Sequence, residues 1–345
     1  MSKAVQWIVS ALTGTMLLGG AASAEQVVNI YTSREPGLIS PLLKSFTEQT
    51  GIKTNMVYIR DGMAERAAAE GVNSPVDVML AVDIGRLAHP KELGISQPLM
   101  SDTISANIPA QYRDPEGHWV GLSQRARVVY ASRERVKLTE ITYEDLADPK
   151  WKGKVCTRSG QHTYNIALLA SIIANDGEAK AEAWARGVKA NLARKPAGGD
   201  RDQAKAIYAG ECDLALANTY YVAAMQLNEK NPEQKKWAAA IRIIFPNEKG
   251  RGTHVNITGA ILAKHAPNKA NGVKLVEFLT SDAGQKVYAE NVHEYPLKSG
   301  VAIADIVKSW GPLHPDKLAF DKISSLRKKA SEIMDKVGFD NGPGS

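Results

Sequence analysis

Residues 27–82 read VVNIYTSREPGLISPLLKSFTEQTGIKTNMVYIRDGMAERAAAEGVNSPVDVMLAV, and this stretch decides the fold. It contains three segments with strand patterns, separated by two segments in which apolar side chains recur at helical spacing. The strands are expected at 27–31, 52–59 and 76–82, and the helices at 38–46 and 64–70, which Gly51 and Gly71 end. The last strand is almost continuously apolar, which is typical of a buried parallel strand. This order predicts an α/β sheet with helices on both faces.

The alternation of strands and helices resumes further along the chain. Strands are expected at 127–132, 154–156, 213–217, 241–245 and 258–263. Helices are expected at 143–146, 164–175, 178–192, 202–209, 219–228, 268–279 and 281–291, and one long amphipathic helix at 317–337. The sequence has no fixed-period repeat and no Pro/Gly/Ser-rich linker. Two α/β regions without a linker predict two lobes joined by crossing strands, with a ligand cleft between them.

The N-terminus has the features of a secretory signal. Lys3 supplies a positive charge, residues 4–20 are mostly apolar or small, and Ala22-Ser23-Ala24 fits the cleavage rule. We expect residues 1–24 to be removed; an uncleaved membrane anchor is the alternative, although the apolar stretch is short and interrupted. No later segment has membrane-spanning length, so the mature protein is expected to be exported without membrane insertion.

Charge and cysteine content narrow the function classes. The formal net charge of +6 is mild and the two signs are interspersed, so we interpret residues 235–236 and 327–329 as solvated faces and expect no nucleic-acid binding. The balance modestly favours anionic ligands. Two cysteines in an exported protein predict one disulfide, Cys156–Cys212, with two buried free thiols as the alternative.

Three tyrosines carry the main chemical signal. Tyr164 lies in SGQHTYN (159–165), and Tyr220-Tyr221 lie in ANTYYV (217–222), each where a loop enters a helix. Adjacent residues in a first helical turn diverge by about 100°, so both can reach one ion beyond the helix start. A free phenol has a pKa of about 10, and a trivalent hard cation such as Fe³⁺ is acidic enough to displace its proton. Packing or sugar stacking by the same rings is the alternative.

Other sites are less supported by the sequence. Free N–H groups at 159–161, including Gln161, offer contacts for an anion bound with the metal. The chain has no His/Cys cluster with zinc-ligand spacing. It also has no GxSxG, HExxH, P-loop or Rossmann glycine motif, which argues against an enzyme.

The sequence resembles the periplasmic ferric-ion-binding proteins of bacterial iron ABC transporters, in particular the group that uses three tyrosines and carbonate. The stretches that carry the resemblance cover most of the mature chain: EGVNSPVDVMLAVDIGRL (70–87), NIPAQYR (107–113), GLSQRARVVY (121–130), KGKVCTRSGQHTYN (152–165), NLARKPAGGDRDQ (191–203), ANTYY (217–221) and GTHVNITG (252–259).

The resemblance implies a two-lobed type II periplasmic binding protein fold with two crossing hinge strands. Lobe 1 would comprise residues 25–123 and about 249–299, and lobe 2 residues 124–248 and about 300–345. It implies Fe³⁺ ligation by Tyr164, Tyr220 and Tyr221, with carbonate as the synergistic anion at Arg125. It also implies a monomer that delivers iron to an inner-membrane iron ABC permease and catalyses nothing.

The loop at residues 32–37, TSREPG, departs from many relatives because it lacks their His ligand. Arg34 matches an Arg of the carbonate-using group, and Glu35 replaces its Gln, so both are candidates for the cleft. We expect His162 to be an exposed loop histidine. The alternative cargoes on the same fold are an organic cation, such as a polyamine or thiamine, and an iron chelate.

Overall fold

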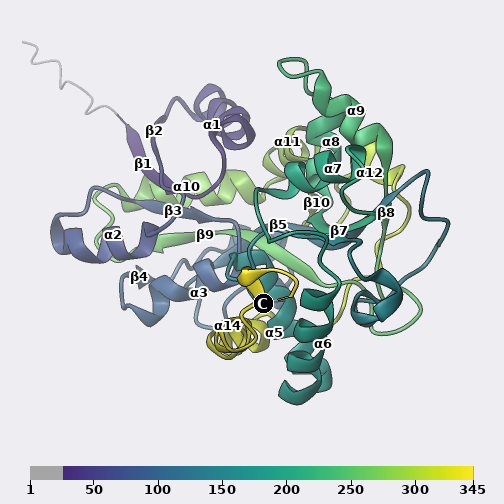
Figure 1. The fold of residues 1–345 in the computed structure, drawn as a ribbon. Helices are drawn as coiled ribbons and strands as arrows, with labels where there is room; N and C mark the ends of the chain where they lie inside the picture. The colour runs from purple at the N-terminus through teal and green to yellow at the C-terminus, as the bar shows by residue number, and fades with distance from the viewer. Residues whose placement is uncertain (1–25, 345) are drawn as a thin grey trace, which may run out of the picture.

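The structure is a computed structural model that describes residues 26–344 (Figure 1). The expected signal peptide and its cleavage site lie outside these residues. Within them, no helix is both long enough and apolar enough to cross a membrane. The ten strands of the described residues form one continuous sheet whose main order is β2-β1-β3-β9-β5-β7-β6.

The first half of the sheet matches the opening stretch of the sequence. Parallel strands β2, β1 and β3 are followed by antiparallel β9, and helices cover both faces. The elements are β1 (Val27–Thr32), α1 (Pro36–Thr50), β2 (Lys53–Tyr58), α2 (Met63–Glu70), β3 (Val78–Ala81), α3 (Ile84–Glu92), β4 (Ser96–Gln97), α4 (Asp102–Asn107), β9 (Val255–Ala263), α10 (Lys269–Thr280), α11 (Asp282–Val292) and β10 (Tyr295–Pro296). The predicted glycine at the end of α1 is confirmed: Gly51 is left-handed, with φ 72°, and its N–H donates to Thr47.

The second half of the sheet is built on the same long strand that closes the first. Strand β5 (Val120–Ser132) pairs with β9 as far as Ala126, and from Arg127 onward it pairs with β7 and β8. The other elements are β6 (Val155–Cys156), α5 (Thr163–Asp176), α6 (Glu178–Ala190), α7 (Asp200–Tyr208), β7 (Leu214–Asn218), α8 (Tyr220–Gln226), α9 (Glu233–Ala240) and β8 (Ile241–Ile244).

We call the half with β1, β2, β3 and β9 the first lobe, and the half with β6, β7 and β8 the second lobe. The chain crosses between them along β5 and again on entering β9, where the Arg127 N–H donates to the His254 carbonyl at 2.9 Å. The predicted two-lobed fold with two crossing strands is confirmed. The residue limits given above for each lobe remain a prediction.

The prediction of a single long helix at residues 317–337 is wrong. The structure has two helices there, α13 (Phe320–Ser325) and α14 (Arg327–Lys336), which are separated at Leu326. Helix α13 packs against α3 and α5. Helix α14 packs along α5 and α6 (Figure 1). The helical hydrogen-bond pattern is interrupted at Leu326, whose N–H donates to the Ile323 carbonyl, three residues back, at 3.3 Å. A short helix α12 (Asp305–Lys308) precedes this pair.

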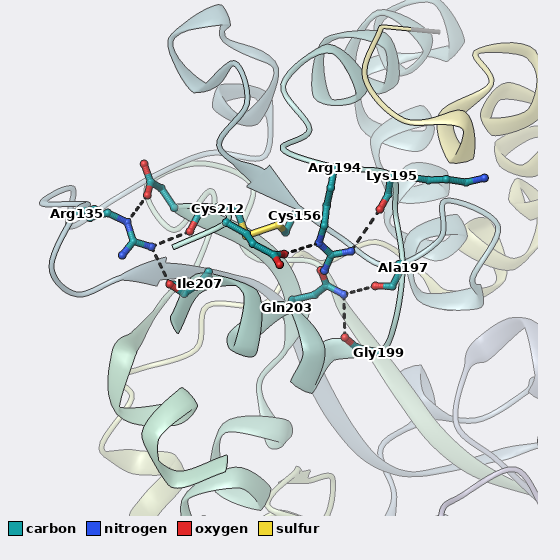
Figure 2. Close-up of a disulfide and its surroundings, with 11 residues drawn as sticks. Arg135, Cys156, Arg194, Lys195, Ala197, Gly199, Gln203, Ile207 and Cys212 are labelled. Carbon is teal, nitrogen blue, oxygen red and sulfur yellow. Dashed lines mark hydrogen bonds and ion pairs between the residues drawn. A yellow bond between two sulfur atoms is a disulfide. The ribbon is translucent and has the colours of Figure 1, made fainter. Parts of the chain in front are cut away.

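The predicted disulfide is confirmed, with 5.9 Å between the Cα atoms of Cys156 and Cys212 (Figure 2). It joins β6 to the start of β7, two parallel neighbours in the sheet. Hydrogen bonds reinforce the surroundings: Arg135 donates to the Cys212 carbonyl at 2.9 Å, and Gln203 donates to the carbonyls of Ala197 and Gly199. Because Gln203 belongs to α7, it holds the loop that leads into this helix against the helix itself.

Candidate functional site

The structure brings the three predicted tyrosines together at the carboxyl ends of β6 and β7. Strand β6 leads to Tyr164 in the first turn of α5, and β7 leads directly to Tyr220 and Tyr221 in the first turn of α8. All three side chains are buried. The hydroxyl oxygens of Tyr164 and Tyr220 are 3.2 Å apart. Because β6 and β7 are parallel neighbours, the two helices begin side by side.

Burial decides the protonation state of the adjacent tyrosines Tyr220 and Tyr221. Their rings lie 4.2 Å apart between centroids, at an angle of 33°. Burial raises the pKa of Tyr220 well above its usual range; the Tyr164 and Tyr221 phenols add to this rise, and Arg34 opposes it. Burial likewise raises the pKa of Tyr221, and Tyr164 and other acidic neighbours add to it. At neutral pH these two phenols are therefore protonated until a cation displaces their protons.

The tyrosines line a cleft of about 390 Å³ to which both lobes contribute. The first-lobe wall includes Arg34 and Glu35, the two candidates from the loop after the first strand. The second-lobe wall includes the tyrosines, Arg158 and Arg201. The three tyrosine rings pack together with Val82 in one small apolar cluster, and all four residues line the cleft.

Arg34 and Glu35 take different positions in this wall. Arg34 is only 2% exposed and pairs with the fully buried Glu294 at 2.8 Å, while its guanidinium lies 5.5 Å from the Tyr220 ring centroid. Burial opposes the ionisation of Glu294, but Arg34 and Arg125 hold its pKa below the usual range. Glu35 is more exposed and reaches across the cleft to Arg201 at 3.2 Å.

Arg125 differs from the other buried arginines near the site. Its Nη2 donates to the Val82 carbonyl, and its guanidinium lies 5.4 Å from the Tyr164 ring centroid. Its Nη1 is buried without a hydrogen-bond partner in the part of the chain that the structure describes. Among residues 26–344, no carboxylate lies within 4.0 Å of it. Arg127 and Arg158, by contrast, both pair with the buried Asp200, at 2.8 and 3.1 Å.

In the loop before α5, Gln161 and His162 both make contacts that the sequence did not predict. The Gln161 amide donates to the Ser331 carbonyl and to Asp335 on α14, and Gln161 is not among the residues that line the tyrosine cleft. His162 is half-buried rather than exposed, because its Nδ1 accepts the Tyr164 N–H at 3.2 Å and its ring packs edge-on against the phenol. Burial, aided by Arg158, lowers the pKa of His162 to about 2, so its imidazole is neutral.

Sequence reasoning missed the charged residues that surround the phenols. Arg158, Asp200 and Arg201 lie within the family-like stretches 152–165 and 191–203, but no role was derived for them. Their sequence separation hides the arrangement, because only the fold places the start of α7 beside the start of α5. Within residues 26–344, no group of three or more His, Cys, Asp or Glu side chains could hold a metal ion.

Residues 73–315 match the family model of the bacterial extracellular solute-binding proteins. The chain belongs to this family. Among characterised members, this solute-binding protein is similar to iron uptake protein A1 of Synechocystis, with 43% identity over 91% of the chain and 88% of the relative. It is also similar to the major ferric iron-binding protein of Neisseria meningitidis, with 28% identity over 93% of the chain and 96% of the relative.

Solved structures agree with this placement. The Bordetella ferric binding protein is 52% identical, with a TM-score of 0.83 over 92% of this chain and all of the other. The apo ferric ion-binding protein A of Pasteurella haemolytica is 46% identical, with a TM-score of 0.87 over 91% of this chain and 98% of that one. A Trichodesmium relative solved with iron and citrate is 43% identical, with a TM-score of 0.85 over 91% of this chain and 99% of that one.

Proposed function

We propose that this solute-binding protein captures Fe³⁺ in the cleft through Tyr164, Tyr220 and Tyr221. The observation that carries the proposal is the convergence of three buried phenols from two neighbouring helix starts, with 3.2 Å between two of their oxygens. Three phenolates would balance the charge of a trivalent ion. Mg²⁺ and Ca²⁺ favour carboxylate and carbonyl oxygen, and they lack the acidity needed to displace phenol protons.

We further propose that Arg125 holds a small oxyanion beside the metal, with carbonate as the first candidate. Its buried and unpartnered Nη1, and the lack of an ion-pair partner, support this role. A planar guanidinium with free N–H groups suits a planar, bidentate oxyanion. Citrate accompanies iron in the Trichodesmium relative, so carbonate and citrate are the two anions to compare.

An organic cation is less well supported as cargo. The guanidinium groups of Arg34, Arg125 and Arg158 already lie within 5.5 Å of the Tyr220 or Tyr164 ring centroids, where a polyamine or thiamine would have to bind. The positive field of these groups favours anionic ligands around the metal instead.

The proposed setting is the periplasm, where the exported monomer delivers iron to an inner-membrane ABC permease. The names of the iron-uptake and ferric-binding relatives support this setting, as does the signal-like sequence at residues 1–24. We propose no catalytic step.

The proposal is tested by titrating purified mature protein with a ferric chelate while recording visible absorption, with bicarbonate, with citrate and with neither. We expect a broad charge-transfer band that saturates at one iron per chain and is lost or strongly shifted in Tyr220→Phe. A band that depends on only one of the anions identifies the synergistic anion, and loss of that dependence in Arg125→Gln supports its binding at Arg125. Saturating iron without any band would refute tyrosinate ligation.

A further inference from the structure

The first residue of α14, Arg327, lies between the two lobes. Its Nη1 pairs with Asp83 at 2.8 Å in the first lobe, and its Nη2 donates to the Thr163 hydroxyl at 2.8 Å in the second. Nη1 also donates to the Thr163 carbonyl at 3.4 Å. The side chain is 20% exposed, although the sequence predicted a solvated face for residues 327–329. One guanidinium therefore bridges the end of β3 and the start of α5.

The first-lobe end of this bridge is held rigidly. Asp83 is fully buried and caps α3, where it accepts the Gly85 N–H at 2.9 Å. Its second oxygen accepts from the Asn256 amide at 2.7 Å, and Asn256 belongs to crossing strand β9. These two charge-assisted hydrogen bonds fix the position of the Asp83 carboxylate, which accepts from Arg327.

Gly85 provides the space for the guanidinium. A Cβ atom at Gly85 would overlap the Nε, Cζ and Cδ atoms of Arg327. The backbone φ of Gly85 is not in the left-handed region, so this glycine is required by the close approach of the side chain and not by backbone conformation. Arg327 therefore lies flat against the first turn of α3.

The second-lobe end of the bridge is next to a proposed metal ligand. Thr163 begins α5 and directly precedes Tyr164. We infer that Arg327 is a positioning residue that locks the start of α5, and with it Tyr164, to the first lobe when the cleft is closed. This inference rests on the proposed function. Opening the lobes requires the guanidinium to leave either Asp83 or Thr163, so the bridge slows release of the bound ion.

The test uses two variants that remove the same contact in different ways. Arg327→Gln removes the charged guanidinium group. Gly85→Ala keeps the guanidinium but displaces it from its position against α3. Alanine is the better helix former, so the second variant should fold. Lys328→Gln is the matched control, because Lys328 is the exposed neighbour on the same helix and its loss changes net charge equally.

The main measurement is the rate at which iron-loaded protein loses its charge-transfer band to an excess of a strong chelator. We expect release to be roughly tenfold faster in Arg327→Gln and in Gly85→Ala, the range for a lost charge-assisted contact, and nearly unchanged in Lys328→Gln. The double variant should match the faster single variant, since both changes remove one contact. Release rates equal to that of Lys328→Gln, or additive effects, would overturn the inference.

A second measurement separates this inference from the proposed function. A wild-type protein with no band refutes tyrosinate ligation but leaves the bridge to be tested. Small-angle scattering of the metal-free proteins should then give a larger radius of gyration for Arg327→Gln and Gly85→Ala than for wild type and Lys328→Gln. Equal radii would overturn the bridge.

Discussion

The pH dependence of iron binding counts the phenols that act as ligands. Each phenol that binds the metal must release one proton, because a free phenol has a pKa of about 10 and burial raises the pKa of Tyr220 and Tyr221 further. By linkage, the logarithm of the binding constant rises by about one per pH unit for each proton released. Three ligating phenols therefore contribute a slope of about three near neutrality.

Tyr220→Phe should lower this slope by one. Over two pH units, the phenol contribution should change by about 10⁶ in wild type and by about 10⁴ in the variant. The metal-free fold should survive, because the variant keeps the buried ring, and the lost hydrogen bond between the Tyr220 and Tyr164 hydroxyls is worth about 1 kcal/mol. At every pH at which wild type binds iron, the variant should bind iron more weakly than wild type.

Tyr295→Phe is the matched control. Tyr295 is also a buried tyrosine, but its hydroxyl has no hydrogen-bond partner and lies outside the cleft lining. The assay is a spectrophotometric competition against one chelator at several values between about pH 6 and 8. Proton release by the chelator and by the anion is common to all three proteins, so the difference between slopes is the quantity of interest. Wild type and Tyr220→Phe with equal slopes would refute the ligand assignment, whatever their affinities.

Three further predictions follow from the site and its support. Arg125→Gln should abolish the dependence of iron binding on bicarbonate, whereas Gln161→Ala should retain it, as titrations with and without the anion will show. Asp200→Asn should destabilise the fold by about 3 kcal/mol or more, because it leaves two buried guanidinium groups without their carboxylate; chemical denaturation measures this. Replacing Cys156 and Cys212 by alanine should lower the free energy of unfolding by about 2–4 kcal/mol, seen as a lower denaturant midpoint; the slope should rise, because the unfolded chain without the cross-link exposes more surface.

The sequence predicts most of the fold because its periodic segments are strong. The apolar run before Val82 and the helix ended by Gly51 are both local signals, and the structure contains both elements. The first half of β5 was missed, since Gln124 and Arg125 interrupt its apolar pattern. Both lie on a strand whose pairing with β9 depends on residues more than a hundred positions away.

The site was only partly predictable for a related reason. Adjacent Tyr220 and Tyr221 at a helix start are visible in the sequence, and so is a separate Tyr164. The three tyrosines lie close together because β6 pairs in parallel with β7, and no local sequence pattern indicates that pairing. Arg327 was assigned to the surface because it stands in a run of basic residues. Its inward position comes from its contacts with Asp83 and Thr163, which are distant from it in sequence.

The origin of all three phenols in one lobe has a consequence for the thermodynamics of capture. Helices α5 and α8 start from neighbouring strands joined by the disulfide, so the conformational entropy of assembling the three oxygens is lost when the chain folds. If the three phenols ligate iron as proposed, an arriving ion meets ligands that are already arranged, and the entropic cost of binding is reduced accordingly. We then expect lobe opening, rather than assembly of the ligands, to set how long the ion stays.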